Sequence, residues 1–344
     1  MYKQRMSRIG IIMILAAMCI TSALYAEGSW RVLHETDQDY NDYQAISFIS
    51  PKKGWVVGAS FDVNPGVLRE TNDGGRTWDK VELDIDKNLK NIYFYENKYG
   101  WIVGEGGMII HTRDSGRRWG FQQSNVFTPL SGVYFVNDKV GYAVGAYETV
   151  LKTVNGGRGV GWKVISGGTV PEGQGNDPAY MYNAVYFADE LTGWAAGLYV
   201  DPVAQTQNSV IRKTTDGGMT WVDQPTETED MINDIFFIDS TGWAVGENGL
   251  ILHTTNSGET WNIQASGTEE ILKTVRFADE KVGWAGGGEL GVSVLVHTTD
   301  GGETWQMQTI DNPKLSNRPV FDIFIFEKKH VWLTGEQGMV LQYK

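Results

Sequence analysis

Seven short runs of apolar and aromatic residues are spread along the chain, at positions 46–49, 92–95, 133–136, 185–188, 235–238, 275–278 and 323–326. They are apolar at nearly every position, which is typical of a strand that is covered on both faces. No segment shows sustained periodicity of 3.6 residues, so the pattern predicts an all-β protein. One column inside the runs holds a bulky residue in every copy: Phe48, Phe94, Phe135, Phe187, Phe237, Phe277 and Ile325.

Each run is followed by a segment that reads Gly-aromatic-x-x-Gly, although Val331 replaces the first Gly of the last copy. The aromatic residues are Trp55, Trp101, Tyr142, Trp194, Trp243, Trp284 and Trp332, and consecutive copies are 41 to 52 residues apart. This period fits the four-stranded blade of a β-propeller. We expect the run to form the first strand and the aromatic segment the second, with the third and fourth typified by 250–254 and 261–264. Seven copies predict a seven-bladed β-propeller.

A more specific motif lies between the expected third and fourth strands. Residues 71–78 read T-N-D-G-G-R-T-W, and variants occupy 112–119, 153–162, 214–221, 254–261 and 298–305. This is the Asp-box pattern of the bacterial neuraminidase repeat. The Asp or Asn side chain accepts backbone N–H groups within a turn, Gly takes the left-handed conformation, and Trp supplies a large apolar area.

The box residues are predicted to be structural, because the motif is repeated in blade after blade whereas an active site occurs once. The residues are Asp73, Asp114, Asn155, Asp216, Asn256, Asp300, Trp78, Trp119, Trp162, Trp221, Trp261 and Trp305. We therefore predict neither a catalytic nor a metal site among them.

The chain has six boxes but seven Gly-aromatic segments, and this mismatch predicts how the ring closes. The carboxyl terminus stops within the third strand of the last repeat, whereas residues 28–33 resemble the end of a box followed by a fourth strand. We expect the amino-terminal strand to close the last blade, which leaves no exposed edge inside the ring.

The first 26 residues differ in composition from the repeats. A basic start, an apolar run over 9–20 and small residues before position 27 predict a signal peptide at 1–26, followed by one propeller domain at 27–344. We therefore expect an exported protein, periplasmic or extracellular. A membrane anchor or a lipidated Cys19 is the alternative interpretation of the same segment.

The remaining composition excludes several classes of partner and cofactor. Removing residues 1–26 takes away three basic residues and no acidic one, so the net charge falls from −13 to −16. Such a charge disfavours nucleic acid. Cys19 is the only cysteine, so the mature chain can form neither a disulfide nor a thiolate metal site. We expect no cofactor and a monomer.

Candidate binding residues are those predicted to open the first strands, at one mouth of the central channel, together with Arg276. They are Lys90, Asn183, Asn233, Asp234, Lys273, Arg276 and Asp322. Arg276 interrupts a largely aromatic column, so it needs a partner if it is buried, and Asp234 or Asp322 could supply one. A structural ion pair is the favoured interpretation. The loops on this face are also the more irregular ones, and function tends to lie on such loops.

Residues 242–254 and the box that follows them resemble the repeat of the photosystem II stability/assembly factors. The resemblance covers the mature chain and implies a lumenal seven-bladed propeller that holds protein subunits of a membrane complex without a cofactor. In a photosynthetic source the compartment would be the thylakoid lumen. Members of that family are said to present an arginine-rich patch, and no corresponding cluster is evident in this acidic sequence.

Two functions follow from these patterns. The first is a non-catalytic exported scaffold that binds a protein partner. The second is an Asp-box propeller of the sialidase or xyloglucanase kind, which binds or hydrolyses a glycan. Most glycoside hydrolases need two carboxyl groups about 5–9.5 Å apart across a cleft, and nothing in the sequence marks Asp234 and Asp322 as such a pair. The sequence therefore favours the scaffold over an enzyme.

Overall fold

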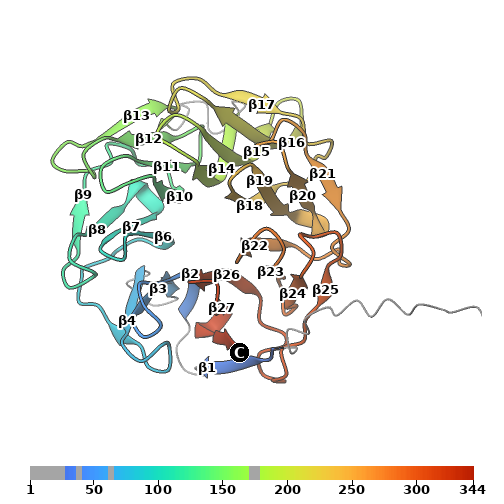
Figure 1. Cartoon of the computed structure of the whole chain (residues 1–344). Helices are drawn as coiled ribbons and strands as arrows, with labels where there is room; N and C mark the ends of the chain where they lie inside the picture. Colours follow the sequence, from blue (N-terminus) through green and yellow to red (C-terminus); the bar gives the residue numbers. More distant parts are fainter. Residues whose placement is uncertain (1–27, 36–40, 61–65, 170–178) are drawn as a thin grey trace, which may run out of the picture.

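The computed structural model describes residues 28–35, 41–60, 66–169 and 179–344. These residues form seven four-stranded antiparallel sheets arranged as a ring around a central axis (Figure 1). The predicted all-β, seven-bladed propeller is confirmed. The predicted signal peptide at 1–26 lies outside the described residues.

Blades 1 to 3 follow the chain order, with the first strand next to the axis. Blade 1 contains β2 (Asn41–Phe48), β3 (Gly54–Ser60), β4 (Gly66–Thr71) and β5 (Asp79–Lys80). Blade 2 contains β6 (Leu89–Tyr95), β7 (Tyr99–Gly104), β8 (Ile109–Thr112) and β9 (Gly120–Gln122). Blade 3 contains β10 (Leu130–Phe135), β11 (Gly141–Gly145), β12 (Val150–Thr153) and β13 (Trp162–Ser166).

Blades 4 to 6 repeat this arrangement, and the first three strands of blade 4 are longer. Blade 4 contains β14 (Ala179–Phe187), β15 (Gly193–Asp201), β16 (Thr206–Thr214) and β17 (Val222–Gln224). Blade 5 contains β18 (Ile232–Ile238), β19 (Thr241–Gly246), β20 (Ile251–Thr254) and β21 (Asn262–Gln264). Blade 6 contains β22 (Leu272–Phe277), β23 (Gly283–Gly287), β24 (Val294–Thr298) and β25 (Gln306–Met307).

Blade 7 combines the two ends of the chain. It contains β26 (Val320–Phe326), β27 (His330–Gly335), β28 (Val340–Tyr343) and the outer strand β1 (Trp30–His34). β1 runs antiparallel to β28, with Trp30 opposite Tyr343 and Val32 opposite Leu341. The predicted closure by the amino-terminal strand is therefore confirmed.

Stacked aromatic side chains join neighbouring blades, which explains the two repeated columns of the sequence. In every blade except blade 6, the aromatic residue of the second strand stacks on the Phe of the next blade's first strand, with ring centroids 3.4 to 4.6 Å apart. The pairs are Trp55–Phe94, Trp101–Phe135, Tyr142–Phe187, Trp194–Phe237, Trp243–Phe277 and Trp332–Phe48. The box Trp of the same blade then meets each Phe near edge-on, a favoured aromatic geometry.

The Gly before each second-strand aromatic residue makes room for the Phe of its own blade. A Cβ atom built on it would lie 2.3 to 2.7 Å from that ring in blades 1 to 6, closer than any real contact. In blade 7 the Phe is replaced by Ile325, and Val331 stands opposite it in place of Gly. The last repeat has therefore lost both residues of the pair together.

Hydrogen bonds inside each box turn follow the predicted chemistry. The first Thr accepts the N–H of the box Gly at 2.8 to 3.0 Å. The Asp or Asn carboxyl or amide oxygen accepts a further backbone N–H at 2.9 to 3.1 Å. Burial opposes ionisation of Asp73, but the N–H groups of Thr77 and Arg76 and the hydroxyls of Thr77 and Thr71 outweigh it and lower its pKa to about 2.

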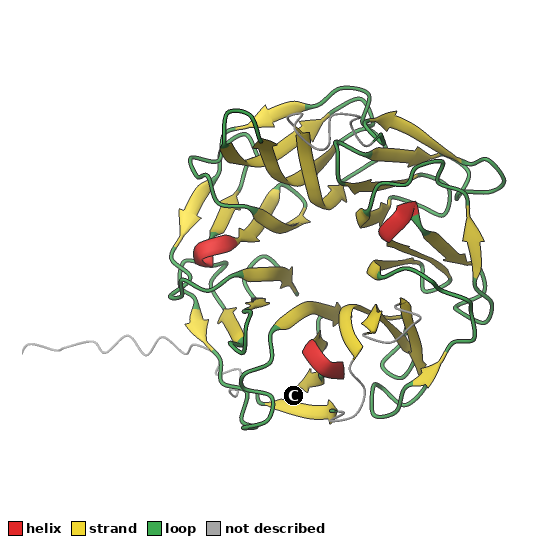
Figure 2. Ribbon diagram, turned by 180° about the vertical axis from the view of Figure 1, so that it is seen from behind, coloured by secondary structure: helices red, strands yellow, loops and turns green. Residues whose placement is uncertain are grey.

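The turns define two faces of the disc. Each box turn is hydrogen-bonded to the turn between the first and second strands of its own blade, as from Gly74 N–H to the Lys52 carbonyl and from Gly217 N–H to the Leu191 carbonyl. We call this side the box face. The second-to-third turns bond to the connections between blades on the opposite side, which we call the loop face. Three short 3-10 turns lie in these second-to-third connections: η1 (Glu105–Gly107), η2 (Glu247–Gly249) and η3 (Glu336–Gly338) (Figure 2).

Candidate functional site

The central channel is a hollow of about 900 Å³ among the described residues. First strands from all seven blades line it, because each first strand lies next to the axis. All seven residues predicted at the channel mouth are in its lining: Lys90, Asn183, Asn233, Asp234, Lys273, Arg276 and Asp322. The structure therefore brings the whole predicted set together.

One side chain from each blade forms a collar around the channel. The seven residues are Ser47, Tyr93, Tyr134, Tyr186, Phe236, Arg276 and Phe324. Tyr93, Tyr134 and Tyr186 pack in sequence, with ring centroids 4.9 and 4.8 Å apart, and burial raises the pKa of all three hydroxyls. The collar is therefore uncharged and aromatic over blades 2 to 5 and charged at blade 6.

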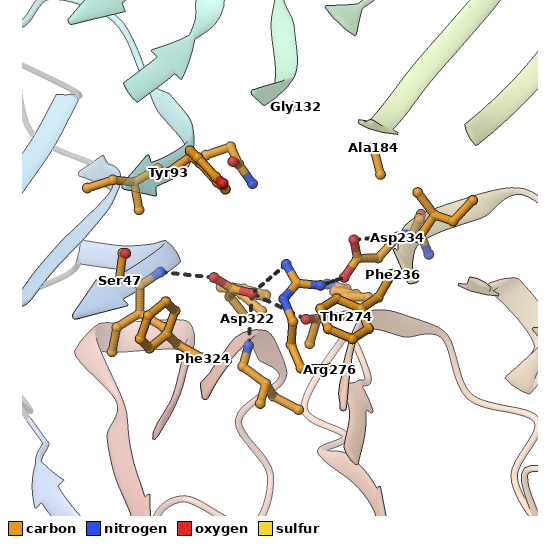
Figure 3. A pocket seen from close by; sticks show the side chains of 18 of the residues that line it. Ser47, Tyr93, Gly132, Ala184, Asp234, Phe236, Thr274, Arg276, Asp322 and Phe324 are labelled. Carbon is orange, nitrogen blue, oxygen red and sulfur yellow. Dashed lines mark hydrogen bonds and ion pairs between the residues drawn. The ribbon is translucent and has the colours of Figure 1, made fainter. Parts of the chain in front are cut away.

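Arg276 is paired with both predicted partners (Figure 3). Its guanidinium contacts the Asp234 carboxylate, and a second nitrogen lies 3.6 Å from the Asp322 carboxylate. Burial alone would lower the pKa of Arg276, but the two carboxylates outweigh it and raise that pKa. The geometry is that of an ion pair within the channel wall, joining blades 5, 6 and 7.

Asp322 is the most enclosed of these charges, only 9% exposed. Its carboxylate accepts the backbone N–H of Ile46 at 3.0 Å, that of Ile323 at 2.9 Å and the hydroxyl of Thr274 at 3.2 Å. Burial nevertheless dominates and, with the nearby Asp234 charge, raises the pKa of Asp322 to about 6. One side chain thus links blade 7 to blades 1 and 6.

Three more of the predicted residues hold adjacent first strands together. Asn183 donates its amide to the Ile232 carbonyl and Asn233 to the Leu272 carbonyl, both at 2.9 Å. Asp234 accepts the Val275 N–H at 3.0 Å. Adjacent blades share no sheet hydrogen bonds. These side chains therefore supply polar contacts between blades, and in this structure their polar groups are engaged there.

Lys90 and Lys273 are the predicted residues that remain directed to the mouth. Lys90 lies 3.5 Å from Glu105 and its side chain is 38% exposed. The Lys273 ammonium lies 4.6 Å above the ring of Phe321, and burial lowers its pKa. Each is the second residue of an innermost strand, at the end that lies on the loop face, so a partner that approaches the channel from this face would meet both.

The two carboxylates of the channel are engaged with one arginine. Asp234 and Asp322 are joined through Arg276 instead of flanking an open space. Within the described residues no group of three or more His, Cys, Asp or Glu side chains could hold a metal ion. No helix in the described part of the chain is long and apolar enough to cross a membrane.

The structure brings together arginines that are far apart in the sequence. Burial lowers the pKa of His111, and the charges of Arg113 in the blade 2 box and Arg158 in the blade 3 box lower it further, to about 4. Arg117 and Arg118 belong to the same box turn as Arg113. The sequence separates Arg113 from Arg158 by a whole repeat, and only the ring places the two boxes side by side.

The fold and its contacts define a seven-bladed propeller built from Asp-box repeats and joined by stacked aromatic pairs. The family model described as photosynthesis system II assembly factor YCF48 matches residues 24–126, 185–266 and 259–344. The chain belongs to this family.

Curated relatives match over a short segment. The photosystem II assembly lipoprotein Ycf48 of Synechococcus sp. (strain CC9902) is 35% identical over 69 residues, 19% of each chain. The photosystem II stability/assembly factor HCF136, chloroplastic, of Arabidopsis thaliana is 30% identical over 67 residues, 19% of this chain and 15% of that protein. The matched segments thus span less than a fifth of these relatives.

Solved structures share the fold over nearly the whole chain. A structure of YCF48 bound to D1 peptide has a TM-score of 0.68 and 21% identity, covering 93% of this chain and 97% of that one. YCF48 from Cyanidioschyzon merolae has a TM-score of 0.66 and 18% identity, covering 92% and 98%. The GH74 enzyme of Niastella koreensis has a TM-score of 0.64 and 13% identity, but this chain covers only 53% of it. At these identities the structures establish the fold alone.

Proposed function

We propose that this protein is a non-catalytic, exported propeller that binds a protein partner through its loop face, at the mouth of the channel. Residues 27–344 would form one domain after removal of the signal peptide at 1–26. Membership of the assembly-factor family is the observation that carries the proposal. The solved YCF48 with a bound D1 peptide supports a polypeptide ligand, and a subunit of a photosystem II complex is the corresponding partner in a photosynthetic source.

The loop face has the features of a protein-binding surface. Four large apolar side chains stand exposed on it, on the blade 2–3 connection and on turns of blades 4 and 6: Phe127 (88% exposed), Val203 (77%), Leu290 (95%) and Val292 (39%). Exposed aromatic and aliphatic residues of this kind are the usual anchors of an interface. Lys90 and Lys273 add charge near the axis.

A glycan-hydrolysing function has less support. The channel carboxylates are engaged in holding blades 5, 6, 7 and 1 together, so using them as acid and nucleophile would break those contacts. The GH74 neighbour is about twice as long as the part that this chain matches. The family of assembly factors likewise indicates a non-enzymatic role.

A capture experiment from the exported fraction of the source organism tests the proposal. The paired variant Lys90→Glu with Lys273→Glu and a second variant, Leu290→Ser, alter the loop face and keep the ion pairs and hydrogen bonds between blades described above; Lys273→Glu removes only the contact of its ammonium with the Phe321 ring. Lys281→Glu is the matched control, because it lies in blade 6 like Lys273 but on the box face. We expect both loop-face variants to lose the captured protein and the control to retain it.

Loss of the captured protein in the control alone would place the binding surface elsewhere. Release of reducing sugar from a panel of glycans by the wild-type protein would overturn the non-catalytic assignment. An unchanged thermal unfolding temperature of each variant is required, so that lost binding is not lost folding.

A further inference from the structure

One position of the Asp box varies around the ring in an ordered way. The residue after the last box Gly in blades 1, 2, 4, 5 and 6, and its counterpart in blade 3, is exposed in all six boxes: Arg76, Arg117, Arg158, Met219, Glu259 and Glu303. Blades 1 to 3 thus carry Arg, blade 4 carries Met, and blades 5 and 6 carry Glu. The same eight-residue box forms with Arg, Met or Glu at this position in blades 1, 2, 4, 5 and 6, so folding does not dictate this order.

The rest of the box face follows the same division. The box turns and the first-to-second turns of blades 1 to 3 carry nine Lys or Arg and four Asp or Glu residues. The corresponding turns of blades 4 to 6 carry one Lys and nine Asp or Glu residues. One face of an acidic protein is therefore basic over three consecutive blades and strongly acidic over the next three.

Apolar side chains mark the boundary between the two halves. Every exposed large apolar residue in the turns of the box face, among the described residues, lies in blade 3 or 4: Val154 (62% exposed), Val160 (76%), Leu191 (57%) and Met219 (77%). The position of Leu191 holds Lys in five other blades: Lys52, Lys98, Lys139, Lys281 and Lys329. The blade 3 and blade 4 turns are neighbours, since Lys152 of blade 3 donates to the Gly217 carbonyl of blade 4 at 3.0 Å.

This pattern is complementary to itself under a two-fold rotation. A two-fold axis in the plane of the face, passing through blade 7 and between blades 3 and 4, puts blade 1 on blade 6 of a second copy, blade 2 on blade 5, and blade 3 on blade 4. Each of the basic blades 1 to 3 then meets one of the acidic blades 4 to 6, and the apolar residues of blade 3 meet those of blade 4. Blade 7, whose turn carries Glu327, Lys328 and Lys329, meets the same blade of the other copy. We propose that the box face is the interface of a symmetric, face-to-face dimer of this chain.

A second copy is the occupant that satisfies both halves of the face. An acidic peptide would complement only blades 1 to 3, and would leave the acidic half and part of the apolar boundary uncovered. The dimer reverses the monomer expected from the sequence. It also directs both loop faces outward, so one dimer would present two partner-binding surfaces and gain avidity for a partner held in a membrane or a larger complex.

Sedimentation velocity of the purified mature protein over a concentration series, at low and high salt, tests the dimer. We expect reversible dimerisation that weakens as salt screens the charges. Arg117→Glu should weaken dimerisation about tenfold, because it faces Glu259 of the other copy twice across the two-fold axis. The charge-swapped double variant, Arg117→Glu with Glu259→Arg, should restore the dimer to within about twofold of the wild type.

Both substitutions exchange residues that the same box position already holds elsewhere in this chain, so each should fold. Leu191→Lys introduces the residue that five other blades hold at this position, and it should also weaken the dimer. Lys273→Glu, on the loop face, should not. A protein that remains monomeric at low salt up to about millimolar concentration overturns the proposal. A dimer whose dissociation constant is unchanged by Arg117→Glu, or that the charge-swapped double variant fails to restore, contradicts the proposed interface. Neither result bears on the proposed partner binding, which the capture experiment tests separately.

Discussion

The buried carboxyl of Asp322 predicts how the stability of the protein changes with pH, because its surroundings disfavour the ionised form. Burial raises the pKa of Asp322 from 3.8 to about 6. The folded protein therefore holds a proton on this group between about pH 4 and 6, where the unfolded chain has released it. The contribution to stability is complete below about pH 4 and is lost as the pH rises through about 6.

The size of the effect follows from the shift of roughly two pKa units, which corresponds to about 3 kcal/mol of unfolding free energy. Asp322→Asn keeps the shape of the side chain but cannot ionise, so it removes this dependence on pH. The unfolding free energy of the wild type minus that of the variant should therefore be about 2–3 kcal/mol larger near pH 4 than near pH 7.5, because at pH 4 the unfolded carboxyl is already partly ionised. Other carboxylates titrate in both proteins and cancel in the difference.

Urea unfolding followed by tryptophan fluorescence, at both pH values and on both proteins, measures this difference directly. A separate cost is expected at every pH, because one backbone N–H, of Ile46 or Ile323, would face the Asn amide instead of an oxygen. If the unfolding free energy of the wild type minus that of the variant stays constant with pH, or grows at higher pH, burial does not raise the pKa of Asp322 and the reasoning is refuted.

Two further predictions concern the repeat. Thr254→Val leaves the Gly258 N–H without its acceptor and should lower the unfolding free energy by about 1–3 kcal/mol. Thr255→Val, at the exposed neighbouring position, should change it little. Thermal unfolding of both variants measures this, and equal effects would contradict the turn assignment. Gly242→Ala places a Cβ about 2.3 Å from the Phe237 ring and should lower the unfolding free energy by roughly 1–3 kcal/mol. The Cβ of Gly120→Ala meets no atom within 4 Å, so this variant should be as stable as the wild type. Unchanged stability of Gly242→Ala would contradict the packing argument.

The sequence predicted the blades because each blade repeats its own packing rule. A Phe on the first strand needs the Gly beside it and an aromatic residue on the previous blade, so the two columns appear together in the chain. The seventh repeat supports the rule, since Ile325 and Val331 replace both members of the pair. The unequal number of boxes and Gly-aromatic segments was enough to predict that the chain ends meet in one sheet.

The role of the channel residues was harder to predict. Their place at the mouth follows from topology, but hydrogen bonds such as that from Asn183 to the Ile232 carbonyl depend on side-chain direction. A polar residue beside the axis can therefore point to a ligand or to the adjacent blade, and its residue type is the same in both cases. Asn233 and Asp234 point to the next blade in this structure.

Charge on the box face escaped prediction for a different reason. Arg113 and Arg158 are a full repeat apart in sequence, and their proximity depends on the spacing of adjacent blades around the ring. Reading one position down all six boxes would have revealed the order from Arg through Met to Glu. The box fixes its Thr, Asp, Gly and Trp positions for the turn and leaves this position free to vary.

Site-specific photo-crosslinking in the source organism tests the central claim, partner binding at the channel mouth, most directly. A photoreactive amino acid at position 273 faces the proposed partner, and the same amino acid at position 281 lies in the same blade on the opposite face. We predict a crosslinked protein of a different sequence at position 273, and at most a crosslink between two copies of this chain at position 281. A foreign crosslink at position 281 with none at position 273 would contradict the account.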